Sequence, residues 1–130
     1  MAAEDMKRKL TAILSADVQG YSRLMGDDEQ ATVETITAYR KVMTDLIQDH
    51  HGKVVDAKGD NVLAEFPSVV GAIQCAVEIQ KELKRKNADL PEHRKMEFRI
   101  GVNLGDVIEK DETIYGDGVN IAASTPSQKF

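Results

Sequence analysis

The order of hydrophobic repeats along the chain constrains its fold more than any other feature of the sequence. Residues Leu10 to Ala16 follow a two-residue repeat, which predicts a strand that ends at Asp17. Gly20 breaks this repeat, and a short helical turn is expected around Tyr21 to Met25. The chain is therefore expected to begin with a strand that a helical segment follows closely.

Two longer segments have the spacing of amphipathic helices. The first follows a capping aspartate, Asp27 or Asp28, and has apolar residues at three- and four-residue steps from Val33 to Ile47. Gly52 ends this helix. The second begins at Ser68 and keeps the same spacing, with its basic residues on the opposite face. Each helix is expected to bury one apolar stripe against the rest of the fold.

A hairpin is predicted between these two helices. Its strands are Lys53 to Lys58 and Asn61 to Phe66, joined by the tight-turn pair Gly59-Asp60. A fourth strand is predicted over Met96 to Asn103, where apolar and polar residues alternate again. In the sequence, each of the two long helices is therefore preceded and followed by a strand.

The resulting order is strand, helix, strand, strand, helix, strand. It predicts an α+β fold, a ferredoxin-like βαββαβ antiparallel sheet with the helices on one face. Gly105 is expected to turn the chain into a short extra strand at Val107-Ile108. Because no repeat or Pro/Gly/Ser-rich linker divides the sequence, a single domain over residues 1–130 is expected.

Charge and cysteine content exclude several classes of function. The chain has 17 Lys and Arg against 22 Asp and Glu, a net charge of −5, which argues against a nucleic-acid partner. Its one cysteine, Cys75, excludes an internal disulfide and a cysteine-based zinc site. No apolar run approaches the roughly 20 residues that a bilayer requires, and no secretory signal is recognised. A cytoplasmic protein without a membrane segment is therefore expected.

Asp17 and Asp60 are the candidates for metal chemistry. Asp17 ends the first strand and Asp60 lies in the hairpin turn, and both should lie at the same edge of the sheet. Two neighbouring carboxylates are suitable ligands for Mg²⁺ or Mn²⁺. Backbone N–H groups at Gly20, Tyr21 and Ser22, where a helix begins, could cradle a polyphosphate. Aspartate is also common at turns and caps, so a purely structural role stays open for each carboxylate.

Four successive motifs resemble those of the class III adenylate/guanylate cyclase catalytic domain of the bacterial type. They lie within a core of residues 8–123 and are Ile13–Ser22 (ILSADVQGYS), Lys58–Asn61 (KGDN), Phe98–Gly105 (FRIGVNLG) and Ile114–Asn120 (IYGDGVN). The resemblance implies that the ribose 3′-hydroxyl of a nucleoside triphosphate attacks the α-phosphate of the same molecule. A cyclic nucleotide and pyrophosphate would be the products.

The resemblance also assigns roles to single residues. Asp17 and Asp60 would hold two Mg²⁺ or Mn²⁺ ions, with the Val18 carbonyl as an extra ligand. Asn120 matches the asparagine that positions the ribose in the transition state, and the family's transition-state arginine is replaced here by Ser124. The family builds its sites between two chains, which implies a homodimer or a heterodimer with another cyclase domain.

The residues that would contact the base leave the nucleotide undecided. Adenylate-specific members commonly have lysine where this chain has Asp56, and aspartate or threonine where it has Thr113. An ionised carboxylate cannot pair with adenine N1, but it can accept from the adenine amine or from guanine N1–H and N2. Lys58 lies on the same strand face as Asp56, and the two could instead form only a weak surface pair. ATP and GTP both remain open.

Two functions follow from these assignments. With Ser124 in place of arginine, and without the C-terminal segment of the family, the chain is expected to be a weak or inactive cyclase by itself. The alternative is a non-catalytic nucleotide- and metal-binding or dimerisation module that pairs with a full-length cyclase. A palm-type relative such as a diguanylate cyclase would show an acidic hairpin signature that KGDN does not supply.

Overall fold

The fold is an antiparallel sheet with helices packed on it. The structure, a computed structural model, describes the backbone of residues 7–110, 113–115 and 128–129, and the side chains of residues 10–105. Its elements are β1 (Lys7–Val18), α1 (Tyr21–Asp27), α2 (Glu29–Asp49), β2 (Lys53–Lys58), β3 (Asn61–Phe66), α3 (Val69–Asn87), the 3₁₀ turn η2 (Glu92–Arg94), β4 (Phe98–Lys110), β5 (Thr113–Tyr115) and β6 (Gln128–Lys129).

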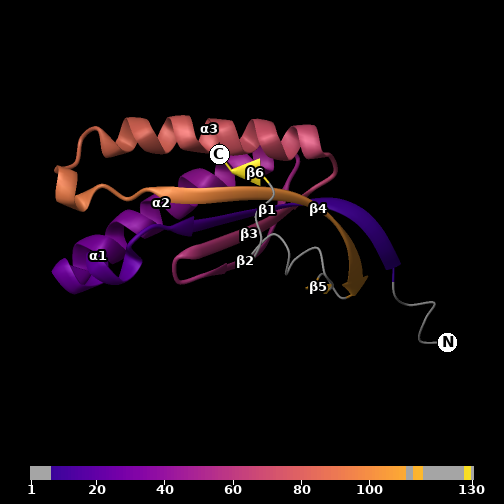
Figure 1. Ribbon diagram of the computed structural model, residues 1–130, viewed down its shortest axis with the longest axis horizontal. Helices are drawn as coiled ribbons and strands as arrows, with labels where there is room; N and C mark the ends of the chain where they lie inside the picture. Colours follow the sequence, from indigo (N-terminus) through magenta and orange to yellow (C-terminus); the bar gives the residue numbers. More distant parts are fainter. Residues whose placement is uncertain (1–6, 111–112, 116–127, 130) are drawn as a thin grey trace.

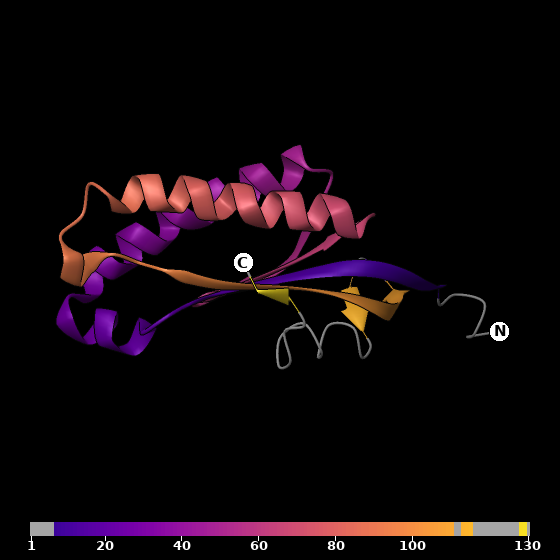
Figure 2. The same cartoon turned by 45° about the horizontal axis from the view of Figure 1, so that its top comes forward.

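The strands form one sheet in the order β2-β3-β1-β4-β5, and β6 also pairs with β4. All of these pairings are antiparallel. Helices α2 and α3 lie side by side on one face of the sheet (Figures 1 and 2). The predicted α+β, ferredoxin-like βαββαβ arrangement with helices on one face is confirmed.

The prediction that Gly105 turns the chain is wrong. Strand β4 continues through Gly105 to Lys110, because Gly105 stays in the ladder opposite Thr11 of β1. A glycine weakens a strand but does not have to end it. The predicted short strand at Val107-Ile108 is thus the second half of β4, and the extra strand is Thr113–Tyr115.

The core lies between the sheet and the two long helices. It consists of alternate residues of the strands and one stripe of each helix, including Ala12, Leu14, Ala16, Met43, Ile47, Phe66, Ile79, Leu83 and Ile100. Side chains cap both helices, since the Asp28 carboxylate accepts from the Ala31 N–H and the Ser68 hydroxyl from the Gly71 N–H, each at 3.0 Å. At the end of α2, a Cβ on Gly52 would lie 2.5 Å from the Phe66 ring, so the close approach there requires glycine.

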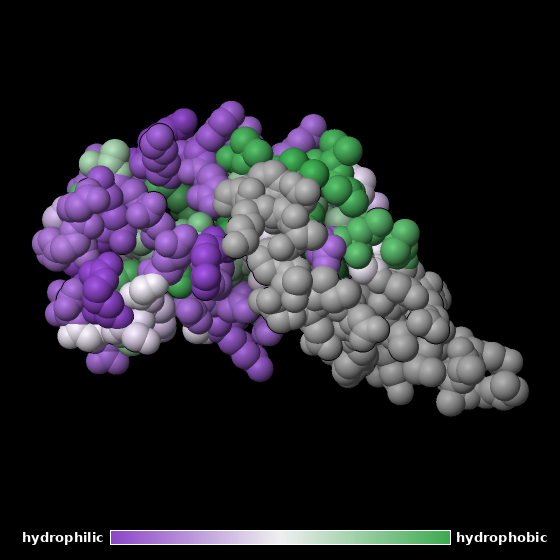
Figure 3. Space-filling model, viewed as in Figure 1, coloured by the Kyte–Doolittle hydropathy of each residue, from purple (hydrophilic) through white to green (hydrophobic). Residues whose placement is uncertain are grey.

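The face of the molecule seen in Figure 3 changes in character from one end to the other. Hydrophilic side chains cover α1 and the start of β4, whereas apolar side chains gather near the start of α3 (Figure 3). Val70 and Val77 of α3 and Leu104 of β4 are among the exposed apolar residues. Among the described residues, no helix combines the length and apolar character needed to cross a membrane.

A buried polar network joins α2, α3 and the start of β4. The Tyr39 hydroxyl donates to Asn87 Oδ1 at 2.7 Å, and the Met96 N–H donates to the same oxygen at 3.0 Å. The Asn87 amide donates to the Met96 carbonyl at 2.9 Å. Burial, followed by the charge of Asp89, raises the pKa of Tyr39, so this hydroxyl remains a donor at neutral pH.

Asn87→Ala is expected to lower the free energy of unfolding by about 3 kcal/mol, because it leaves buried groups of Tyr39 and Met96 without partners. Tyr39→Phe removes only one of these bonds and should cost about 1 kcal/mol. Urea unfolding followed by circular dichroism measures both values. A loss below about 0.5 kcal/mol for Asn87→Ala would contradict the role of the network, since surface changes of that size are ordinary.

Candidate functional site

The pairing of β1 with β3 brings Asp17 and Asp60 to the same end of the sheet. Asp17 lies directly opposite Asn61 in the ladder, and the Val18 N–H donates to the Asp60 carbonyl at 3.1 Å. Both carboxylates are partly exposed. This is also the end of the sheet at which α1 begins (Figure 1). The structure therefore places side by side the two segments that carry the predicted metal ligands.

The turn that carries Asp60 is held in two ways. Gly59 has a φ of 54°, a left-handed conformation that two-residue hairpin turns need and that glycine adopts without strain. The Arg40 guanidinium of α2 donates to the Gly59 carbonyl. A helix on one face of the sheet thereby fixes the backbone immediately before Asp60.

Asp17 belongs to a row of polar residues across four strands. Lys58 of β2 pairs with Asn61 of β3, Asn61 with Asp17 of β1, and Asp17 with Arg99 of β4. Residues directly opposite each other in a ladder share a face of the sheet. Because the neighbours of Asp17 on β1 are part of the core, this row lies on the outer face, meaning the face turned away from α2 and α3.

Arg99 forms an ion pair with Asp17, with Nη2 2.9 Å from Oδ2. The side chains are 65% and 30% exposed, and such a pair contributes little to stability, so Asp17 can exchange this partner for another. No role for Arg99 follows from the sequence alone. Its alternation with the buried Phe98 and Ile100 was the available signal that it faces away from the core.

The donors present at this site fit a divalent cation of the Mg²⁺ or Mn²⁺ type. Asp17 and Asp60 offer carboxylate oxygens, and Asn61 Oδ1 is buried with no hydrogen-bond partner among the residues that the structure describes. Within the described residues no group of three or more His, Cys, Asp or Glu side chains could hold a metal. Mg²⁺ commonly takes one or two carboxylates and completes its shell with water and substrate phosphates.

The predicted phosphate-binding residues follow β1 directly. Gly20 has a φ of 65° and precedes α1, and the Leu24 N–H donates to its carbonyl at 3.0 Å. Tyr21 packs against the core, whereas Ser22 is exposed. These three residues thus lie at the same end of the sheet as Asp17, and a phosphate-binding role for them stays a prediction.

The predicted base-contacting residues are not brought together within one chain. Asp56 and Lys58 are exposed on β2, at one edge of the sheet, and Thr113 lies in β5 at the other edge. Strands β3, β1 and β4 separate them. Asn120 and Ser124 lie outside the described residues, so their expected roles stay predictions.

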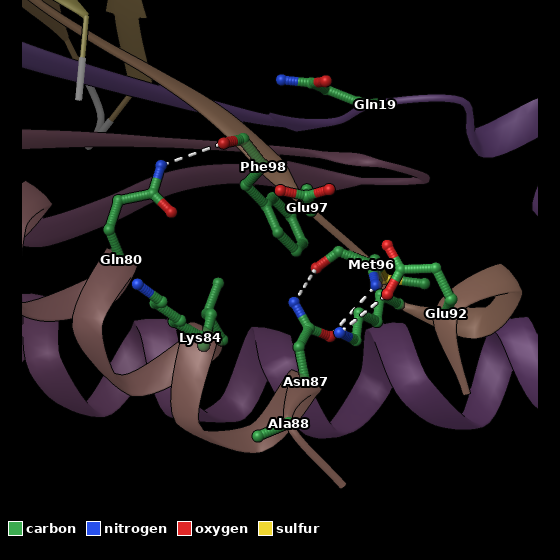
Figure 4. A pocket seen from close by; sticks show the side chains of 11 residues that line it. Gln19, Gln80, Lys84, Asn87, Ala88, Glu92, Met96, Glu97 and Phe98 are labelled. Atoms are coloured by element: carbon green, nitrogen blue, oxygen red, sulfur yellow. Dashed lines mark hydrogen bonds and ion pairs between the residues drawn. The ribbon is translucent and has the colours of Figure 1, made fainter. Parts of the chain in front are cut away.

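A cavity of about 550 Å³ lies on the other side of the sheet from the aspartates, between α3 and the start of β4 (Figure 4). Gln19, Gln80, Asn87 and Phe98 are among its lining residues. The Gln80 amide donates to the Phe98 carbonyl at 2.9 Å, and the polar atoms of the Asn87 side chain are satisfied by the network described above. Neither Asp17 nor Asp60 lines this cavity, so it is separate from the candidate metal site.

Cys75 does not contribute a reactive thiol. Burial raises its pKa to about 12, and the charges of Asp49 and Glu78 add to this effect. The thiol is fully buried in the core on α3. At neutral pH it is protonated and behaves as a small apolar side chain.

Known proteins share this fold. A crystal structure of an adenylate/guanylate cyclase/hydrolase from Silicibacter pomeroyi is 37% identical with a TM-score of 0.85, over 95% of this chain and 74% of that one. A bacterial light-regulated adenylyl cyclase is 26% identical with a TM-score of 0.86, over 94% of this chain and 40% of that one.

Sequence relatives agree with the structural ones. The Rhizobium meliloti (strain 1021) protein named "Putative adenylate cyclase 3" is 47% identical over 124 residues, which are 95% of this chain and 21% of that protein. The chain thus spans about a fifth of the length of this curated relative. The family model of the adenylate and guanylate cyclase catalytic domain matches residues 4–129. With nearly the whole chain matched, it belongs to the adenylate and guanylate cyclase catalytic domain family.

Proposed function

We propose that this chain is a single nucleotidyl cyclase domain that converts ATP or GTP to a cyclic nucleotide and pyrophosphate, with little activity by itself. The family generally depends on divalent metal ions, binds nucleoside triphosphates and acts as dimers. The observation that supports this function best is the juxtaposition of Asp17 and Asp60, which the hydrogen bond from the Val18 N–H to the Asp60 carbonyl fixes.

The chain's own residues would bind and orient the triphosphate. Asp17 and Asp60 would hold the cations, with the Val18 carbonyl as a further ligand. The cations, when bound, would stabilise the attacking ribose oxygen and the charge on the leaving pyrophosphate. Arg99, which pairs with Asp17 in this structure, would be available to pair with a phosphate if Asp17 bound a cation instead. The N–H groups at Gly20, Tyr21 and Ser22 lie at the same end of the sheet.

The second half of the site is proposed to come from a partner chain. Asn120 would position the ribose, and Asp56, Lys58 and Thr113 would contact the base.

The low activity follows from Ser124. A serine is short and neutral, so it cannot place a guanidinium against the phosphate at the moment of transfer. Contacts of that kind accelerate phosphoryl transfer by factors of about 10³ to 10⁵. A homodimer of this chain would keep two metal sites and lack both arginines.

The purified chain is expected to turn over MnATP or MnGTP more slowly than about 0.1 s⁻¹, against typical enzyme values of about 1 to 10³ s⁻¹. Chromatography of the cyclic products measures the rate for each nucleotide. Asp17→Asn is the control, and it should remove what activity there is. Faster turnover would contradict the expected low activity. If Asp17→Asn forms product at the same rate as the unmodified chain, Asp17 is not part of the active site.

A second candidate function uses the same residues without catalysis by this chain alone. Ser124 favours a module that supplies Asp17 and Asp60 to a mixed dimer with another cyclase domain. Such a module should restore activity to a cyclase domain whose two metal-binding aspartates have been replaced. If no activity returns although the two chains associate, this candidate is wrong.

A further inference from the structure

We propose that the side-chain oxygen of Asn61 is a third side-chain ligand, besides Asp17 and Asp60, of a divalent cation at this site. This inference rests on the proposed cyclase metal site and deepens it. It concerns the residue that follows Asp60 in the chain and faces Asp17 across the ladder. Asn61 is thus a neighbour of both carboxylates, one through the backbone and one through the sheet.

The position of Asn61 places its side chain beside that of Asp17. In an antiparallel pair, the Cβ atoms of directly opposite residues lie about 4.5 to 5.5 Å apart on the same face. The same row continues to Arg99, whose guanidinium already reaches the Asp17 carboxylate at 2.9 Å. Among the described residues, Arg99 is the cationic side chain that contacts the Asp17 carboxylate, and Asn61 lies on the opposite side of Asp17 from it.

The Asn61 oxygen is buried and has no hydrogen-bond partner among the described residues. The buried carboxamide of Asn87 provides a contrast, because its oxygen accepts two hydrogen bonds and its amide donates one. Buried polar atoms are nearly always satisfied in folded proteins, so an unsatisfied one at a candidate site calls for an explanation. A bound cation would give this oxygen its missing partner.

The chemistry of a carboxamide suits this place. Its oxygen is a hard donor of the kind that Mg²⁺ and Mn²⁺ accept, and it carries no charge. A neutral ligand adds affinity for the cation without adding negative charge that would repel a triphosphate. A carboxylate at position 61 would hold the cation more tightly and oppose the nucleotide.

Mn²⁺ binding to the 130-residue chain without nucleotide tests this proposal. The free Mn²⁺ signal in electron paramagnetic resonance measures the affinity of each variant. Asn61→Leu, which keeps the size and removes the oxygen, should weaken Mn²⁺ binding by about tenfold. Asn61→Asp should bind Mn²⁺ at least as tightly as the unmodified chain. Ser15→Ala, on the same sheet face one row away, should not change the affinity.

Thermal unfolding supplies a second measurement that a purely structural role would not reproduce. Without metal, Asn61→Leu should raise the Tm, because it removes a buried oxygen that has no hydrogen-bond partner among the described residues. The rise in Tm that Mn²⁺ produces in the unmodified chain should be smaller in this variant. A structural role would instead lower the Tm and leave the Mn²⁺ effect unchanged.

The outcomes separate this proposal from the one on which it rests. If Asp17→Asn binds Mn²⁺ as well as the unmodified chain, the metal site itself is wrong. If Asp17→Asn loses Mn²⁺ while Asn61→Leu retains the full affinity, the metal site stands and the role of Asn61 is wrong.

Discussion

Replacing Ser124 with arginine is expected to raise cyclic nucleotide formation by this chain by about a thousandfold, because the guanidinium would stabilise the charge that develops during phosphoryl transfer. Ser124 lies four residues after Asn120, where the cyclase family has its transition-state arginine. Four residues is also the spacing that places two side chains on one face of a helix. The gain should appear in the rate at saturating MnATP or MnGTP.

Ser127→Arg is the matched control for this change. It adds the same side chain three residues further along, so it should leave the low rate as it is. Equal rates for the two variants would show that a missing arginine at position 124 does not limit the reaction. A gain in Ser124→Arg alone would support both the alignment of the motif and the reaction type.

In the Ser124→Arg chain, Asp17→Asn or Asp60→Asn is expected to lower the rate by about a thousandfold or more, returning it to the level without the arginine. Each substitution removes a charged ligand of the cations while keeping the size of the side chain. The free energy of unfolding should change by less than about 1 kcal/mol, since the ion pair of Asp17 with Arg99 is largely exposed. Rates and urea unfolding are measured on the same preparations.

Asp45→Asn controls for the loss of a carboxylate elsewhere. Asp45 is exposed on α2, 3.6 Å from the ammonium of Lys41, and should contribute nothing to the rate. A similar loss of activity in this variant would show that the chain responds to its overall charge and not to a metal site. Unfolding of Asp17→Asn would instead assign Asp17 a structural role.

The arrangement of Asp17 and Asp60 could be predicted from the sequence. A two-residue turn at Gly59-Asp60 fixes the register of its hairpin, and an antiparallel sheet then brings the end of the first strand to that turn. Both constraints are local or topological. They do not depend on the details of side-chain packing.

The features that the sequence did not predict depend on tertiary pairing. Glycine is typical of turns, but Gly105 pairs with Thr11 of β1 and stays within the long strand β4. The ion pair of Arg99 with Asp17 joins residues 82 positions apart, which only the register of β1 with β4 reveals. Likewise, only the placement of the described residues shows that none of them forms a hydrogen bond with the Asn61 oxygen.

A mixed-chain assay tests the central claim most directly, namely that Asp17 and Asp60 form the metal half of a site that a second chain completes. One chain keeps both aspartates and Ser124, and the other carries Asp17→Asn together with Ser124→Arg. Each alone should be nearly inactive, and an equal mixture should form cyclic nucleotide at about a quarter of the rate of the Ser124→Arg chain, because half of the randomly paired dimers are mixed and each of these has one complete site. A mixture no faster than its separate components, while the Ser124→Arg chain is active, would contradict the account.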